Sequence, residues 1–173
     1  MDCESNLAFI DGQNLHLGAR QCGWKIDHKK FRIYLKEKYH VAEAYYFLGY
    51  VSDEQRNLYT NLKDAGFVVL FREHGALLKA AKKGNVDSDI VFEMMKALIE
   101  RKDFTSMLLV SGDGDYKKLV DYLIGKDRLK KLLFPNQQFV SSLYRNLPAA
   151  YFDSLDTISI RAKIEYIKNK GSP

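Results

Sequence analysis

The sequence predicts an α/β fold, a three-layer α/β/α sandwich with a mostly parallel central sheet. Short apolar runs rich in β-branched and aromatic residues recur along the chain, and longer segments with apolar residues at three- and four-residue spacing lie between them. No internal repeat or low-complexity tract interrupts this alternation. Strands that alternate with helices form βαβ units, whose helices cover both faces of a parallel sheet.

The apolar runs are the predicted strands, at residues 6–10, 41–50, 67–71, 106–110 and 129–134. The helical spacing predicts helices at residues 28–39, 53–65, 88–101, 115–124 and 137–146, and a C-terminal helix at about 156–168. We expect one domain over residues 1–173, because a chain of this length can bury a sufficient core and no linker divides it.

The composition excludes several classes of protein. With 46% hydrophobic and 13% aromatic residues the chain is neither disordered nor fibrous. No apolar segment approaches the roughly 20 residues that cross a bilayer, and the first residues lack a signal peptide, so we expect a soluble, cytoplasmic protein without a membrane partner. The two cysteines are too few for a disulfide framework and show no C-x-x-C spacing.

The chain carries a moderate positive charge, formally +5 at pH 7. Its basic residues cluster at 25–32, 77–83 and 126–131. A basic surface favours polyanionic partners such as nucleic acids, although scattered solvated lysines would give the same count.

Acidic residues follow two of the predicted strands. The segment FIDGQN places Asp11 after the strand at 6–10, and LLVSGDGDY places Asp113 and Asp115 after the strand at 106–110. Sheets of this class bind their ligands beyond the carboxyl ends of the strands, near the point where the strand order reverses. These carboxylates are therefore expected on the ligand side of the sheet.

A third acidic segment begins the predicted helix at 88–101. In KKGNVDSDIVFEMM, Asp87 and Asp89 open the helix, and Glu93 lies four residues after Asp89 on the same helical face. Asp87 or Ser88 by itself reads as a helix cap.

Asp11 with Gly12 likewise has a local reading, because Asp-Gly is a common turn dipeptide and Asn14 could cap a following helix. The segment with Asp113 and Asp115 exceeds what capping needs.

All three segments lie at the ends of elements on the ligand side of the sheet, and together they favour a metal site. Oxygen-only ligands suit Mg²⁺ or Mn²⁺, while the four histidines show no zinc-binding spacing. No phosphate-binding glycine loop or G-x-S-x-G motif is present.

At these three segments the sequence resembles the NYN domain, the LabA-like branch of the PIN-like nucleases, over roughly residues 5–150. The resemblance implies a PIN-like fold. It also implies four acidic metal-site positions, two polar supporting positions and one basic position. They correspond to Asp11, Asp87, Asp113 and Asp115, to Asn14 and Ser111, and to Lys83. Gly114 and Tyr116 depart from the family pattern, which often has serine and phenylalanine there.

The activity implied by the resemblance is Mg²⁺- or Mn²⁺-dependent cleavage of phosphodiester bonds in RNA. A divalent ion held by carboxylates polarises the scissile phosphate, activates water and stabilises the departing oxygen. We assign Asp11, Asp87 and Asp113 as ligands, directly or through water, and Asp115 as a ligand or a water-orienting base. Asp89 and Glu93 are second choices for these roles.

Substrate binding would fall to cationic and aromatic side chains near the acidic segments. The main candidates for contacts with RNA are Lys79, Lys82, Lys83, His16 and Lys117. Arg20, Lys25 and Trp24 are further candidates. Trp24 is equally well explained as a packing residue under a loop. Aromatic residues near 139–152 are candidates for a homodimer surface.

Two other functions are weighed against the nuclease. A non-catalytic RNA-binding or scaffolding module of the same fold is the main alternative, although such a module would gain by losing its acidic residues. A phosphatase of the haloacid dehalogenase type also uses an aspartate at a strand end, but it needs D-x-D and this chain has Gln13 at the second position.

Overall fold

The computed structural model describes residues 4–49, 51–72 and 86–168. Its strands form a single sheet in the order β3-β2-β1-β4-β5-β6, and every described pair of neighbouring strands is parallel. The strands are β1 (Asn6–Asp11), β2 (Val41–Leu48), β3 (Val68–Phe71), β4 (Met107–Val110), β5 (Leu129–Phe134) and β6 (Phe152–Ser154). The predicted α/β class with a parallel sheet is confirmed.

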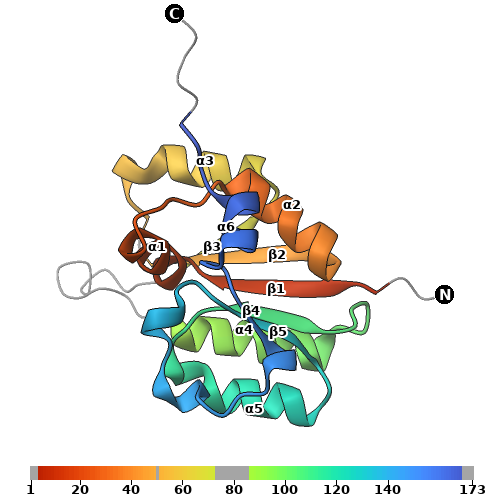
Figure 1. Cartoon of the computed structure of the whole chain (residues 1–173). Helices are drawn as coiled ribbons and strands as arrows, with labels where there is room; N and C mark the ends of the chain where they lie inside the picture. Colours follow the sequence, from red (N-terminus) through yellow and green to blue (C-terminus); the bar gives the residue numbers. More distant parts are fainter. Residues whose placement is uncertain (1–3, 50, 73–85, 169–173) are drawn as a thin grey trace, which may run out of the picture.

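Helices cover both faces of this sheet (Figure 1). The α-helices are α1 (Gly12–Gln21), α2 (His28–Tyr39), α3 (Arg56–Asp64), α4 (Asp87–Glu100), α5 (Lys117–Gly125) and α6 (Ile158–Ile164). The 3₁₀ turns are η1 (Asp53–Gln55), η3 (Gly114–Tyr116), η4 (Gln137–Phe139), η5 (Ser142–Tyr144) and η6 (Ala149–Tyr151). Within the described part of the chain, no helix combines the length and apolar character needed to cross a membrane.

Side chains of β1 alternate between two hydrophobic cores. Ala8 and Ile10 belong to the core that α1, α2, α3 and α6 share with the sheet. Leu7 and Phe9 belong to the core beneath α4 and α5. Successive residues of a strand point to opposite faces, and both faces of this sheet are covered. A central strand must therefore be apolar at consecutive positions, which is why LAFI, residues 7–10, is an unbroken apolar run.

The predicted helix at 137–146 is wrong. This segment forms η4 and η5, separated by extended backbone at Val140 (φ −73°, ψ 136°). The Asn136 side chain accepts a hydrogen bond from Gln138 N, and the Ser141 side chain accepts one from Leu143 N. Short polar side chains that bond to nearby backbone in this way compete with a continuous helix.

Three smaller differences remain between the predicted and the observed elements. Helix α1 had no predicted range, and β6 is a strand of three residues, too short to show an alternating pattern. The C-terminal helix α6 occupies Ile158–Ile164, which is shorter than the predicted 156–168.

The strand order reverses between β1 and β4. From β1 the chain proceeds through β2 to β3 on one side, and from β4 it proceeds through β5 to β6 on the other. Helices that connect strands on opposite sides of such a point diverge, which leaves a crevice beyond the carboxyl ends of the two central strands. Asp11 ends β1, and Ser111 follows β4, so two of the acidic segments meet at this crevice.

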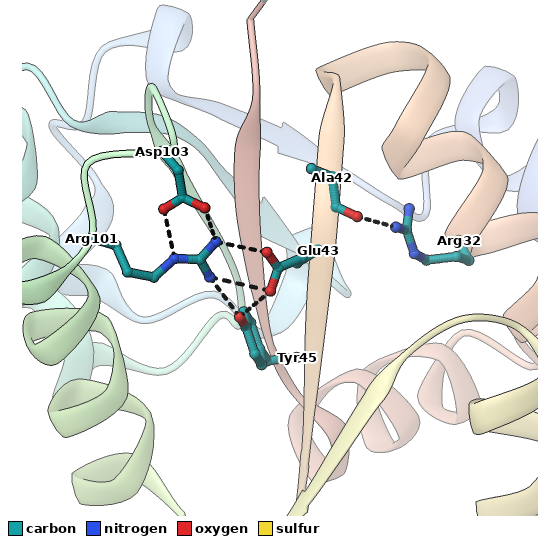
Figure 2. Close-up of polar contacts among 6 residues, drawn as sticks. All are labelled: Arg32, Ala42, Glu43, Tyr45, Arg101 and Asp103. Carbon is teal, nitrogen blue, oxygen red and sulfur yellow. Dashed lines mark hydrogen bonds and ion pairs between the residues drawn. The ribbon is translucent and has the colours of Figure 1, made fainter.

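An arginine joins α4 to β2 away from this crevice (Figure 2). Arg101, which follows α4, donates hydrogen bonds to Glu43, Tyr45 and Asp103. Its Nη2 atom lies 2.7 Å from Glu43 Oε1 and 2.6 Å from Asp103 Oδ2. Across β2, Arg32 of α2 donates to the carbonyl oxygen of Ala42 at 2.7 Å. These arginines fix helices on both faces to the same strand.

Candidate metal centre

Asp11 connects the end of β1 to the start of α1. Its Oδ1 atom accepts a hydrogen bond of 3.0 Å from Asn14 N, so Asp11 is the N-cap of α1, a role that the sequence had suggested for Asn14. At Gly12 a Cβ atom would lie 2.5 Å from Tyr46 Cε1. Only glycine lets the helix begin this close to β2, and the close approach leaves Asp11 5% exposed.

The loop after β4 is held by two polar side chains that the sequence analysis named as supporting residues. Ser111 is fully buried, and its Oγ atom accepts a hydrogen bond of 3.1 Å from Asp113 N. Asn14 Oδ1 accepts one of 2.9 Å from Gly112 N. The second bond connects α1 to the loop and fixes the path of the backbone from β4 to Asp113.

Three carboxylates meet in front of this loop. Asp87 is the first residue of α4, Asp113 is the N-cap of η3, and Asp115 lies within η3. One oxygen atom from each lies within 4.8 Å of the others. Asp87 and Asp113 are half-buried, and Asp115 is exposed. The group is therefore open to solvent on the side of Asp115.

The charges in this group repel one another. The neighbouring Asp113 carboxylate raises the pKa of Asp115, and Asp87 raises it further. A cation among the three carboxylates would offset this repulsion, and an all-oxygen donor set is the one that Mg²⁺ and Mn²⁺ prefer. The residues present thus fit a hard divalent cation.

Asp11 lies beside this group and reaches it through a tyrosine. The Tyr116 hydroxyl is 3.1 Å from Asp11 Oδ2 and 2.8 Å from Asp87 Oδ1. Burial raises the pKa of Asp11, and the charges of Asp87 and Asp113 add to the effect. A hydroxyl has one hydrogen and donates to one carboxylate at a time. Its bond to Asp11 opposes the rise in the pKa of that carboxyl group, and burial remains the larger effect.

The segment that was predicted as a helix supports the loop from the other side. Tyr144, which ends η5, donates its hydroxyl to the carbonyl oxygen of Asp113 at 2.8 Å. Ser141 N donates to the carbonyl oxygen of Gly112 at 3.0 Å. A Cβ atom at Gly114 would lie 2.4 Å from Ser141 Oγ, so a larger residue there requires this segment to move. Sequence reasoning missed Tyr144, because the helical pattern gave it no special place.

Asp89 and Glu93 do not belong to the group of three. Both lie further along α4 and are half-buried. Asp89 Oδ2 is buried without a hydrogen-bond partner among the described residues. The second choices of the sequence analysis therefore remain next to the site, outside the closest cluster.

The basic residues predicted to contact RNA differ in whether the structure describes them and whether they are already paired. Lys79, Lys82 and Lys83 lie outside the described residues. His16 is exposed on α1, and Lys117 forms an ion pair with Asp121 one turn along α5.

Trp24 is 3% exposed and packs in the core, with the guanidinium of Arg161 5.5 Å from its ring centre. Trp24 is therefore a packing residue, and its indole ring is not accessible to a nucleobase.

Other members of the predicted basic clusters make contacts within the protein. Arg32 donates to three backbone carbonyl groups. Lys130 pairs with Glu4, and Lys131 lies 3.6 Å from Asp153 Oδ2. The net positive charge thus serves the fold in part, and the count of basic residues overstates the cations available to a ligand.

Most of the chain is similar to known proteins in sequence and in fold. Residues 7–156 match the family model of the NYN domain. The chain is 25% identical over 171 residues to the "Low amplitude and bright protein LabA" of Synechococcus elongatus, which covers 93% of this chain and 90% of that protein. A crystal structure of a protein of unknown function, VPA0982 from Vibrio parahaemolyticus, superposes with a TM-score of 0.73 at 21% identity. The match covers 94% of this chain and 96% of that one.

Proposed function

The chain belongs to the NYN domain family, and from this premise we propose that it is a ribonuclease that hydrolyses phosphodiester bonds of RNA with a bound Mg²⁺ or Mn²⁺ ion. The observation that carries the proposal is the approach of Asp87, Asp113 and Asp115 to within 4.8 Å of one another at the carboxyl edge of the sheet. Family membership supports RNA as the substrate class.

Asp87, Asp113 and Asp115 are the residues that would hold the ion. When bound there, a divalent cation supplies charge neutralisation for the scissile phosphate and the departing oxygen and lowers the pKa of water. The carboxylates must be ionised to hold the cation, and the cation would offset their repulsion with the negatively charged phosphodiester. Asp11 remains a candidate ligand through water, since Tyr116 places it next to Asp87.

The protein's own groups have distinct tasks in this proposal. Asp115 is exposed and its pKa is raised by its neighbours, so it is the carboxylate best placed to orient a water molecule and accept its proton. Asn14, Ser111 and Tyr144 hold the backbone on either side of Asp113. Tyr116 holds Asp87 and Asp11 in one geometry.

The proposal is tested by cleavage of defined RNAs. Wild-type protein, Asp113→Asn and Asp64→Asn are incubated with single-stranded and structured RNA in Mg²⁺, Mn²⁺ or EDTA. Asp64 is an exposed carboxylate at the end of α3 and serves as the matched control. We expect cleavage by the wild type and Asp64→Asn in either metal, a loss of at least about 100-fold in Asp113→Asn, and no cleavage in EDTA.

The same assay separates the nuclease from its main alternative. Binding of RNA without cleavage in either metal would assign the chain to non-catalytic RNA binding or scaffolding. Cleavage that persists in EDTA, or that Asp113→Asn leaves unchanged, would contradict the proposed centre. Metal binding is measured independently by titrating Mn²⁺ into the wild type and Asp113→Asn by calorimetry.

A further inference from the structure

A pocket of about 170 Å³ opens beside the carboxylates. Its walls come from helix α1, the loop after β4 and the segment after β5. The residues that matter for its chemistry are Asn14, Leu17, Gln21, Gly112, Asn136 and Phe139. None of these was assigned a part in substrate binding by the sequence analysis, in which Asn14 was a supporting residue.

The lining combines exposed apolar surface with side-chain amides. Phe139 is 61% exposed and Leu17 is 45% exposed, so both offer apolar area to an incoming group. The amide of Gln21 makes no hydrogen bond within the described residues and can donate or accept. An apolar face with polar groups at its edge is complementary to a nucleobase, which stacks through its ring and bonds through its edge.

Buried hydrogen bonds hold the shape of the pocket. Asn136 is 3% exposed, and its Nδ2 atom donates to the carbonyl oxygen of Gly18 at 3.2 Å, while its Oδ1 atom accepts from Gln138 N at 2.9 Å. These two bonds connect η4, which carries Phe139, to α1. The wall is therefore set before any ligand arrives, which lowers the ordering cost of binding.

The pocket and the carboxylate group share one wall. Gly112 lines the pocket and directly precedes Asp113. Asn14 lines it too, and bonds to Gly112 N at 2.9 Å. A strand whose phosphate lies at the carboxylates would therefore bring a neighbouring nucleotide to the pocket.

We propose that this pocket binds one nucleobase of single-stranded RNA, with Phe139 stacking on the base and Gln21 bonding to its edge. The inference rests on the proposed function and adds a subsite to it. A second copy of the chain fits less well, because a stable protein interface buries about 1,200–2,000 Å² and this pocket is small and lined in part by amides.

The test compares binding of two strands by three proteins. Dissociation constants are measured by fluorescence anisotropy in Ca²⁺, using a labelled single-stranded RNA of about 12 nucleotides and the same strand with abasic residues. The proteins are wild type, Phe139→Ala and Phe92→Ala. Phe92 is 62% exposed on α4 and does not line the pocket, so it controls for loss of an exposed aromatic ring.

We expect Phe139→Ala to raise the dissociation constant for the normal strand about tenfold and to leave that for the abasic strand within about twofold. Phe92→Ala should match the wild type on both strands. Gln21→Ala is a second pocket variant, expected to weaken only the normal strand.

Equal affinity of Phe139→Ala and the wild type for the normal strand would overturn the proposal, and so would an equal loss on both strands. A wild-type dimer that Phe139→Ala converts to a monomer in sedimentation would assign this surface to self-association instead.

Base-dependent binding without any cleavage would support the subsite and contradict the proposed hydrolysis. Cleavage with no effect of Phe139→Ala on binding would remove only the subsite, and a wild type that binds neither strand would overturn both.

Discussion

Tyr116 and Asp11 are 105 positions apart in the sequence, yet the tyrosine hydroxyl lies 3.1 Å from Asp11 Oδ2. The same hydroxyl lies 2.8 Å from Asp87 Oδ1. Tyr116 stands where the sequence resemblance leads us to expect phenylalanine, and tyrosine differs from phenylalanine by this hydroxyl group. It joins the end of β1 to the start of α4 through one buried oxygen atom.

Tyr116→Phe should lower the free energy of unfolding of the metal-free protein by about 1 kcal/mol, because one buried hydrogen bond is lost and its carboxylate partner is left with fewer donors. Urea unfolding at pH 7 in EDTA measures this. Tyr122→Phe, at a half-exposed position on α5, is the matched control and should leave the unfolding free energy nearly unchanged. Equal stability of Tyr116→Phe and the wild type would contradict this role of the hydroxyl.

The raised pKa of Asp11 predicts a pH dependence of stability in the metal-free protein. Because the folded-state pKa exceeds the ordinary value of 3.8, the folded state binds the proton more tightly than the unfolded state. The contribution of Asp11 to the free energy of unfolding is fully present below about pH 4 and is lost as the pH rises through the folded-state pKa.

Asp11→Asn should remove this loss while keeping the cap of α1, since an asparagine oxygen also accepts from Asn14 N. The stability of Asp11→Asn relative to wild type should therefore increase from pH 4 to pH 8 in EDTA, as measured by chemical denaturation. A difference that stays constant or falls over this range would show that Asp11 has no raised pKa in the folded protein.

Divalent metal should stabilise the folded protein against heat. A ligand that binds only the folded state adds about 2.7 kcal/mol at 100 times its dissociation constant. We expect Tm to rise with the concentration of Mg²⁺ or Mn²⁺ in the wild type and in Asp64→Asn, and to stay nearly constant in Asp113→Asn. A similar rise in Asp113→Asn would place the ion away from the group of three carboxylates.

Arg101→Met should destabilise the protein by about 1 kcal/mol at pH 7, because Arg101 bridges two carboxylates and a tyrosine. Its hydrogen bonds are the main cause of the lowered pKa of Glu43. The pair therefore stabilises the fold above about pH 4.5, and this is lost as the pH falls through the lower folded-state pKa.

The wild type should consequently lose more stability than Arg101→Met on acidification, which urea unfolding at several pH values measures. Arg56→Met provides the comparison, since Arg56 and its partner Asp53 are 78% and 85% exposed, and an ion pair so open to solvent contributes little. If Arg101→Met and Arg56→Met have the same effect, the bridge in Figure 2 does not stabilise the fold.

The sequence predicted most of the sheet because its strands carry their signal locally. The five predicted strands each overlap an observed one, and NLAFI and SMLLV read as buried strands since both faces of the sheet are covered. Residues 137–146 carry apolar residues at helical spacing as well, but Asn136 and Ser141 bond to nearby backbone and turn the chain twice. A pattern of spacing does not register that competition.

By itself, the sequence determined the α/β class, the three acidic segments and the end of the sheet at which they would meet. These depend on the periodicity of apolar residues and on the rule for parallel sheets, both of which are readable along the chain. The tertiary structure alone decided that Asp87, Asp113 and Asp115 form the closest group, that Asp11 joins it through Tyr116, and that Phe139 lies open beside it while Trp24 is buried. Distances of a few ångströms between side chains from separate elements depend on strand order, register and the path of loops, and these are fixed only when the whole core packs.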